Sequence, residues 1–255
     1  MTIRSRDNAQ VKRWAKLARD SRLRRSERRA LIEGPHLIAA ALDAGIMPLA
    51  IIATEAALAE GEAAALVQRS GVAPVLVSPS AFAAIADART PQGIAAEIPL
   101  PRAQRTGTTV FLEGVQDAGN VGTIIRTAAA FGAGEVVLDR DCAEPWSPKV
   151  LRAGQGGHFA LGVRQVDDLP AAIAAFNGRL LCTVARGGRP LHELALNGPL
   201  AWAFGAEGAG LTAAVLGLAT ERVTIPMARA AESLNVAATA AICLYQAAST
   251  SAGGS

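Results

Sequence analysis

Short apolar runs alternate along the whole chain with segments of helical periodicity, and this alternation limits the possible folds more than any other feature. It predicts an α/β architecture in which helices pack against sheets. Strands are expected at 28–34, 49–53, 73–78, 93–98, 108–114, 135–139, 179–184, 200–205 and 222–226. Helices are expected near 8–19, 35–44, 60–69, 79–86, 121–131 and 233–248. In the second half, the strand–helix alternation predicts a mostly parallel sheet.

A stretch rich in proline and polar residues, 99–107, has no periodicity and separates the two halves. It predicts an interdomain linker, with one domain over 1–98 and another over 108–255. A chain of 255 residues with 51% hydrophobic residues is long enough for two domains with cores of their own. The same composition excludes disorder over most of the chain.

Basic side chains are concentrated at the N-terminus. Residues 1–33 hold eleven Arg or Lys and four acidic residues, a net charge of +7, whereas the remainder sums to −4. Most of the eleven are Arg, which suits bidentate contacts with phosphate. The asymmetry predicts a nucleic-acid partner bound in a salt-sensitive way. The alternative is a solvated helix face or a mobile tail, and charge alone does not separate DNA from RNA.

Several classes of protein are excluded. Cys142, Cys182 and Cys243 are few, odd in number and far apart, so a disulfide-stapled scaffold is excluded and burial in the core is expected. No Cys/His spacing predicts a metal site. No stretch approaches the roughly 18 apolar residues of a membrane span, and the polar N-terminus does not look like a secretory signal. We therefore expect a soluble, cytoplasmic protein with no membrane partner.

Three segments of the second half carry polar residues beside glycines. In the first, 113–138, a strand leads through a glycine-containing loop into an apolar helix that contains Asn120 and Arg126. Both are expected near the carboxyl edge of the sheet, where open α/β sheets bind ligands. The alternative is that Asn120 only caps the helix and Arg126 is a surface residue. The loop lacks the GxGxxG spacing, which argues against a nicotinamide-dependent oxidoreductase.

The second segment, FGAEGAGL (204–211), is a glycine-rich loop directly after a strand. Its glycines allow close backbone approach to a ligand, but Glu207 would repel phosphate and suits a cationic or hydroxyl-bearing ligand. In the third segment, 225–246, Ser233 is expected to cap the terminal helix, and Asn235 needs a hydrogen-bond partner. That helix is so apolar that we expect the core and a second subunit to cover it.

Taken in this order, the Asn…Arg, GxEGxGL and IPM…SLNV segments resemble those of one family, the SpoU (TrmH-like) RNA ribose 2′-O-methyltransferases of the SPOUT superfamily. The resemblance covers 108–248. Upstream, LIEGPHLIAAAL (31–42) and TPQGIAAEI (90–98) resemble the family's substrate-binding domain, a small α/β domain similar to a class of ribosomal RNA-binding proteins.

The resemblance implies a parallel α/β sheet whose C-terminal part is threaded through a loop as a deep trefoil knot. It also implies a homodimer that needs no metal and uses S-adenosylmethionine as methyl donor. Backbone atoms would hold the donor at Gly205, Ile225, Met227 and Leu234, with Thr183 as a further candidate.

The chemistry requires alignment of a ribose 2′-hydroxyl with an already electrophilic methyl group, and alignment alone supplies about 7–11 kcal/mol of barrier reduction. The resemblance assigns Arg126 as the base. A guanidinium with a pKa above ~12 is a poor base, so orientation of a phosphate is an equal alternative. Asn120, Glu207, Ser233 and Asn235 would hold Arg126 and the substrate in place.

Ribosomal RNA is favoured over transfer RNA, because a separate N-terminal domain and a basic segment suit a large structured RNA. The alternatives are a transfer RNA 2′-O-methyltransferase and a non-catalytic RNA-binding or ribosome-assembly protein. The modified nucleotide and a role in antibiotic resistance stay open. The side chains expected to contact RNA are Arg13, Arg24, Arg25, Arg28, Arg29, Lys149 and Arg152.

Overall fold

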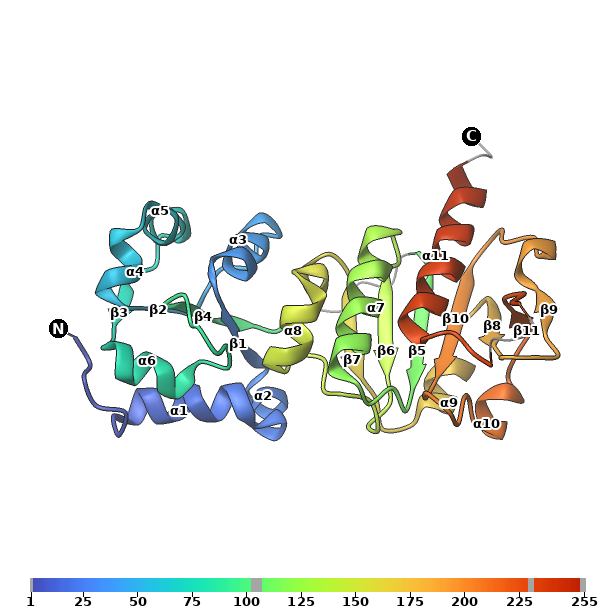
Figure 1. Cartoon of the computed structure of the whole chain (residues 1–255), viewed down its shortest axis with the longest axis horizontal. Coiled ribbons are helices and arrows are strands. Elements are labelled where there is room, and N and C mark those ends of the chain that lie inside the picture. The colour runs from blue at the N-terminus through green and yellow to red at the C-terminus, as the bar shows by residue number, and fades with distance from the viewer. Residues whose placement is uncertain (1, 102–106, 229–231, 253–255) are drawn as a thin grey trace. The chain divides into compact units, whose positions relative to one another are not determined.

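The computed structural model describes residues 2–101, 107–228 and 232–252, with the backbone alone at 251 and 252. The chain divides into two compact units, each built around a sheet of its own (Figure 1). The first unit comprises residues 1–101 together with 146–159, and the second comprises 102–145 and 160–255. The segment 146–159 therefore groups with the N-terminal half of the chain.

The first unit contains a four-stranded sheet in the order β1-β4-β2-β3. Its strands are β1 (Arg29–Glu33), β2 (Ala50–Ala53), β3 (Pro74–Leu76) and β4 (Ile94–Pro99). Its helices are α1 (Ala9–Arg19), α2 (Ser21–Glu27), α3 (Pro35–Asp43), α4 (Glu55–Ala59), α5 (Gly61–Ser70), α6 (Pro79–Ile85) and α8 (Pro148–Gly154), with a 3₁₀ turn at Gly157–Phe159. Strand β4 runs antiparallel to β1 and β2, while β2 and β3 are parallel, so this sheet is mixed.

Helix α1 forms as the sequence predicts. The Asn8 side chain accepts a hydrogen bond from the Gln10 N–H at 2.9 Å and caps the helix. Its apolar side chains, spaced three or four residues apart, bury Trp14 and Leu17 in a cluster that includes Phe82 of α6. Helices α1 and α6 thus cover one face of the sheet, and α3 and α5 cover the other (Figure 1).

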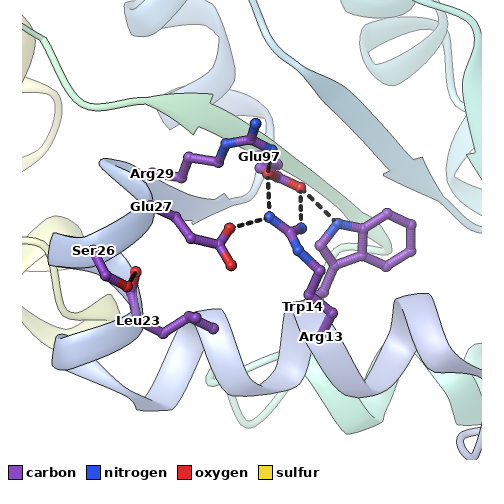
Figure 2. Close-up of polar contacts among 7 residues, drawn as sticks. All are labelled: Arg13, Trp14, Leu23, Ser26, Glu27, Arg29 and Glu97. Carbon is purple, nitrogen blue, oxygen red and sulfur yellow. Dashed lines mark hydrogen bonds and ion pairs between the residues drawn. The ribbon is translucent and has the colours of Figure 1, made fainter.

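A buried carboxylate joins α1 to this sheet. Glu97 on β4 is 3% exposed and accepts hydrogen bonds from Arg13 at 2.8 and 2.9 Å, Arg29 at 2.7 Å and the Trp14 indole at 3.0 Å (Figure 2). Arg13 also pairs with Glu27 of α2. Burial by itself raises the pKa of Glu97, but the hydrogen bonds outweigh burial and hold that pKa below its usual value.

The second unit contains a seven-stranded sheet in the order β7-β6-β5-β10-β8-β11-β9, with every neighbouring pair parallel. Its strands are β5 (Thr109–Glu113), β6 (Glu135–Leu138), β7 (Gly162–Gln165), β8 (Arg179–Thr183), β9 (Arg189–Pro190), β10 (Leu200–Gly205) and β11 (Glu221–Thr224). Its helices are α7 (Ala118–Ala130), α9 (Leu169–Ala174), α10 (Ala213–Leu216) and α11 (Val236–Ala252), with a 3₁₀ turn at Leu191–Glu193. The predicted parallel sheet is confirmed.

Both faces of the parallel sheet are covered (Figure 1). On one face, Ile173 of α9 and Val215 of α10 pack in a cluster with Phe111 of β5. On the other, α7 and α11 lie side by side, and α11 also contacts β10. The strand order reverses where β5 meets β10. In such sheets, ligands bind at the carboxyl ends of the strands near this reversal.

Helix α7 begins at Ala118, three residues before the predicted start. The reason is its cap: the Asp117 carboxylate accepts a hydrogen bond from the Asn120 N–H at 2.8 Å. The interpretation of Asn120 as merely the capping residue is therefore wrong, and its side chain is available for other contacts.

Helix α11 begins at Val236 rather than at 233. The side chain of Asn235 accepts hydrogen bonds from the N–H groups of Ala237 and Ala238, at 2.9 and 3.2 Å. The expectation that Ser233 caps this helix is therefore wrong. Asn235 lies closer to the apolar run and provides the same kind of acceptor.

The remaining differences concern short elements and the linker. The elements α2, α4, α8, α9, α10, β7 and β9 are too short to give a periodic signal, and none was expected. Strand β4 extends to Pro99, and the N–H of Leu100 still bonds to the carbonyl of Arg28 at 2.9 Å. Most of the predicted linker, 102–106, lies outside the described residues.

The three cysteines are buried, as expected of core residues. Burial raises the pKa of Cys182 to about 11 and that of Cys243 to about 12, and it raises the pKa of Cys142 further. These thiols are therefore protonated near neutral pH. Within the ranges that the structure describes, no helix is long and apolar enough to cross a membrane.

We expect Glu97→Gln to lower the free energy of unfolding by about 2–4 kcal/mol at pH 7, because two arginines lose their shared charge partner. The pKa of Glu97 is lowered by folding, so its stabilisation is complete above the unfolded-state pKa and is lost as the pH falls through the folded-state pKa. Urea denaturation of both proteins from pH 7 to pH 3 should show the difference shrinking with acidity. Glu62→Gln, on the exposed face of α5, is the control, and a pH-independent difference would contradict this account.

Candidate active site

A cavity of about 490 Å³ opens at the carboxyl edge of the parallel sheet. Its walls come from the residues that follow β8 (183–185), the loop after β10 (205–210) and the chain from the end of β11 into α11 (223–227 and 232–239). This volume lies within the range of about 300–1,000 Å³ that is usual for small-molecule sites. The sheet edge at which the strand order predicts ligand binding therefore contains a cavity.

The residues predicted to hold a donor molecule meet at this cavity. All five of them line it: Thr183, Gly205, Ile225, Met227 and Leu234. Glu207, Ser233 and Asn235 line it as well. The structure therefore brings together segments that the sequence singled out separately, although the role of each residue stays a prediction.

The glycine-rich loop is shaped by one close backbone contact. A Cβ atom on Gly205 would lie 2.2 Å from the carbonyl carbon of Gly210, so any larger residue would force the loop open. Gly208 and Gly210 have φ values of +88° and +69°, in the left-handed region that glycine adopts without strain. The N–H of Gly210 closes the turn on the carbonyl of Ala206 at 2.9 Å. The loop thereby presents Glu207 at its tip.

Three polar side chains from the three predicted segments form one hydrogen-bonded group, which we call the Asn–Glu–Asn triangle. Asn120 Nδ2 donates to Glu207 Oε1 at 2.7 Å, and Asn235 Nδ2 donates to the same oxygen at 3.0 Å. Asn235 Nδ2 also lies 3.1 Å from Asn120 Oδ1. The partner that the sequence required for Asn235 is therefore found, and α7, the loop after β10 and α11 are joined at one point.

The cavity is electrostatically suited to a cation. Glu207 and Glu232 both line it, and its described lining residues include no Lys or Arg. Carboxylates attract cations and repel anions. Among the described residues, no group of three His, Cys, Asp or Glu side chains is placed to hold a metal ion.

Arg126 is not part of this arrangement. It lies exposed on α7, outside the cavity lining, and its side chain forms no hydrogen bond or ion pair with the rest of the described chain. Ser233 lines the cavity but does not bond to the triangle. Of the five predicted catalytic positions, the structure thus groups Asn120, Glu207 and Asn235 directly.

Sequence reasoning did not identify several lining residues. Val184 and Ala185 follow β8 at the carboxyl edge, and the rule that ligands bind at this edge would have found them. Thr239 lies one helical turn after Asn235 and donates to its carbonyl at 3.1 Å, a spacing that could also have been read from the sequence. No sequence motif marks Glu232 as a residue of this cavity.

The basic residues of the first unit differ in how far their side chains are exposed to an RNA partner. Arg24 is 3% exposed and donates to the carbonyls of Leu17 and Ala18 at 2.7 and 2.8 Å. The structure thus gives Arg24 a role inside the unit rather than the surface contact that was expected. Arg25 and Arg28 are exposed.

The other predicted RNA contacts include residues that pair with acidic side chains and, among the described residues, one that is exposed without such a pair. Arg13 and Arg29 are paired with Glu97, as described above, and keep about a third or more of their side chains exposed. Arg152 pairs with Asp87 at 3.0 Å, and Lys149 is exposed.

Comparisons with known proteins agree with this arrangement. A family model described as the SpoU rRNA Methylase family matches residues 107–245, and one described as an MRM3-like substrate binding domain matches residues 8–96.

Among individual relatives, the 23S rRNA (guanosine(2553)-2′-O)-methyltransferase RlmP of Bacillus subtilis is 35% identical over 95% of this chain and 97% of its own length. An uncharacterised tRNA/rRNA methyltransferase of Synechocystis sp. is 39% identical over 68% of this chain and 66% of its own length. The structure of an AdoMet-bound rRNA methyltransferase from Sinorhizobium meliloti matches with a TM-score of 0.82 at 27% identity, covering 97% of both chains.

Loss of the Asn235 side chain removes a helix cap and two sides of the triangle together. We expect Asn235→Ala to lower the free energy of unfolding by about 2 kcal/mol, and Asn8→Ala, which removes a cap alone, by about 1 kcal/mol. Urea denaturation of the two variants measures both values. Equal losses would mean that the triangle adds nothing to stability.

Proposed function

The chain belongs to the SpoU rRNA methylase family, and we propose that it transfers a methyl group from S-adenosylmethionine to a ribose 2′-hydroxyl of structured RNA, with ribosomal RNA as the substrate. The observation that carries this proposal is the Asn–Glu–Asn triangle at the mouth of an acidic cavity. The relative that covers almost the whole chain is named as a 23S rRNA 2′-O-methyltransferase, which supports ribosomal RNA over transfer RNA.

The cavity suits S-adenosylmethionine, which supplies an electrophilic methyl group on a sulfonium cation. Glu207 and Glu232 favour the positive charge, and the narrow turn at Gly205 brings backbone groups close to a ligand. Backbone atoms of Ile225, Met227 and Leu234 hold the donor together with those of Gly205, and Thr183 at the end of β8 is a further candidate. We assign these residues to donor binding.

The ribose is positioned by the polar residues around the cavity. The triangle fixes the Glu207 carboxylate, and a fixed acceptor orients a hydroxyl without the cost of reorganisation. Arg126 is assigned to the nucleotide, either by orienting its phosphate or by removing the 2′-hydroxyl proton. Its freedom from protein partners among the described residues supports phosphate binding, because a charged guanidinium binds phosphate well and accepts protons poorly. Ser233 is assigned to the same substrate face.

Residues 1–98, which make up most of the first unit, are proposed as the RNA-binding domain, similar to ribosomal RNA-binding proteins, with a linker at 99–107 and the methyltransferase domain over 108–255. Support comes from the net charge of +7 within residues 1–33 and from the substrate-binding family model. Arg25, Arg28, Lys149 and Arg152 are the exposed members of the predicted RNA contacts.

A homodimer and a knotted C-terminal part complete the proposal. Along α11, Ala238, Ile242 and Tyr245 are exposed at a spacing that places them on one side of the helix, and Ile242 and Tyr245 are 40% and 59% exposed. An apolar stripe of this kind is typical of a surface that a second copy covers. We further propose the deep trefoil knot of the family for 108–255 and a cytoplasmic location.

Arg126→Ala tests the assigned division of roles. We expect kcat to fall by about a hundredfold or more, while the affinity for S-adenosylmethionine stays near that of the wild type. Isothermal titration of the donor and single-turnover methyl transfer separate the two effects. Arg126→Lys keeps the charge and should restore part of the rate if the role is phosphate binding. Loss of donor binding in Arg126→Ala would overturn the assignment.

The dimer contact has a matched control. Ile242→Glu places a charge in the proposed interface, and Leu218→Glu places one at another equally exposed apolar residue of the same unit. Light scattering after gel filtration should find a dimer for the wild type and for Leu218→Glu, but a monomer for Ile242→Glu. A monomeric wild type, or a dimeric Ile242→Glu, would contradict the proposed contact.

The reaction itself is tested with labelled S-adenosylmethionine and RNA from cells that lack this protein. We expect label in ribosomal RNA and not in transfer RNA, at a linkage that resists alkali because its 2′-oxygen is methylated. Label in transfer RNA would support the alternative substrate. Donor binding without transfer to either RNA would favour a non-catalytic RNA-binding or ribosome-assembly protein.

A further inference from the structure

A second cavity, of about 340 Å³, lies within the first unit, and every residue that lines it belongs to that unit. Its apolar walls include Leu31, Leu37, Ile85 and Leu151. The polar residues that line it are Glu33, His36, Thr90, Gln92, Arg152 and Gln155. A cavity that combines apolar walls with a few converging polar groups is typical of a ligand site.

Glu33 has one carboxylate oxygen without a partner. Its Oε2 accepts hydrogen bonds from the N–H groups of Asp87 and Ala88, at 2.8 and 3.3 Å. Its Oε1 is buried and accepts no hydrogen bond from the described part of the chain. A buried acceptor left in this state costs about 1–3 kcal/mol, and a donor on a ligand would recover that energy.

Hydrogen-bond donors lie beside this acceptor. Helix α3 follows Glu33 directly, and Gly34 at its start provides no side-chain cap. Pro35 has no N–H group, and the N–H groups of His36 and Leu37, which line the cavity, donate to no acceptor within the described ranges. The first turn of a helix is also its positive end. Among the described residues, Glu33, with one unpartnered carboxylate oxygen, and the first turn of α3, with free backbone N–H groups, thus belong to the same wall of the cavity.

We propose that this cavity binds an unpaired guanine base of the substrate RNA. The Watson–Crick edge of guanine presents two donors, N1–H and the N2 amino group, beside one acceptor, O6. The donors match Glu33 Oε1, the acceptor matches the N–H groups of His36 and Leu37, and the apolar walls cover the ring faces. Proteins recognise single-stranded bases through this edge. The inference rests on the proposed function in one respect, namely that the chain acts on RNA.

Other bases match this arrangement less well. Adenine and cytosine place a ring acceptor where the carboxylate requires a donor. Uracil has a single donor between two acceptors, so it satisfies Glu33 with one hydrogen bond instead of two. The site should therefore favour guanine, then uracil, and should disfavour adenine and cytosine.

The test is a TROSY NMR titration of the isotope-labelled full chain, saturated with S-adenosylmethionine so that the donor cavity is blocked. Guanosine, uridine and adenosine 5′-monophosphates are the probes. We expect guanosine monophosphate to shift the amide signals of His36, Leu37 and Ala88 saturably, with an affinity about tenfold or more above that for adenosine monophosphate. Inosine monophosphate, which lacks the N2 amino group, should bind with intermediate affinity.

Glu33→Gln changes the recognition while keeping the local fold. The glutamine oxygen can still accept from Asp87 and Ala88, but its amide group places a donor where Oε1 was. We expect the preference for guanosine over adenosine monophosphate to disappear. Glu62→Gln, an exposed carboxylate change on α5, should keep the preference, and thermal unfolding confirms that both variants fold.

Equal affinities for the guanosine and adenosine probes, shifts confined to other residues, or an unchanged preference in Glu33→Gln would each overturn the inference. Because the titration does not require turnover, its failure is distinguishable from failure of the proposed function. A protein that methylates RNA without guanine preference contradicts this site alone. A protein with the preference but without methyl transfer contradicts the proposed function alone.

Discussion

The convergence of two amide groups on one carboxylate oxygen organises the second unit. Glu207 projects from the loop after β10, Asn120 comes from the start of α7, and Asn235 comes from the start of α11. A parallel sheet gathers the carboxyl ends of its strands at one edge, and Asn120, Glu207 and Asn235 each lie in the segment that follows a strand, after β5, β10 and β11. The triangle is thus a consequence of topology, and it fixes the mouth of the cavity. Because Asn235 also caps α11, the position of the longest apolar helix depends on the same side chain.

The first unit uses its charge in two ways. A buried carboxylate at Glu97 holds Arg13 and Arg29, and the backbone of α1 holds Arg24, so part of the basic N-terminal segment stabilises the fold. Arg25 and Arg28 stay exposed. Charge counted along the sequence therefore overstates the charge available to a polyanion. Burial of Glu97 would be unfavourable without these partners, since a buried carboxylate requires compensation by hydrogen bonds and opposite charge.

Much of this fold and site could be predicted from the sequence, because the signals involved are local. The apolar runs identified nine strands and helical spacing identified α1. Two of the three glycine- and Asn-containing segments identified residues that line one cavity, and the first supplied Asn120 of the triangle. The failures have physical reasons. Several residues before α7 and before α11 have side chains that can cap a helix. Only the backbone geometry shows that Asp117 caps α7 and Asn235 caps α11. Pairing of Arg13 with Glu97 joins residues 84 positions apart, which no periodicity reveals.

We propose that the residues after β8, the loop after β10 and the chain from β11 into α11 form one donor site beside the triangle. The most direct measurement is hydrogen–deuterium exchange of the full chain with and without S-adenosylmethionine. The account predicts slower exchange in 183–185, 205–210 and 223–239 together, with little change in the first unit. Binding of the donor that protects a different region, or protects only one of these segments, would contradict it.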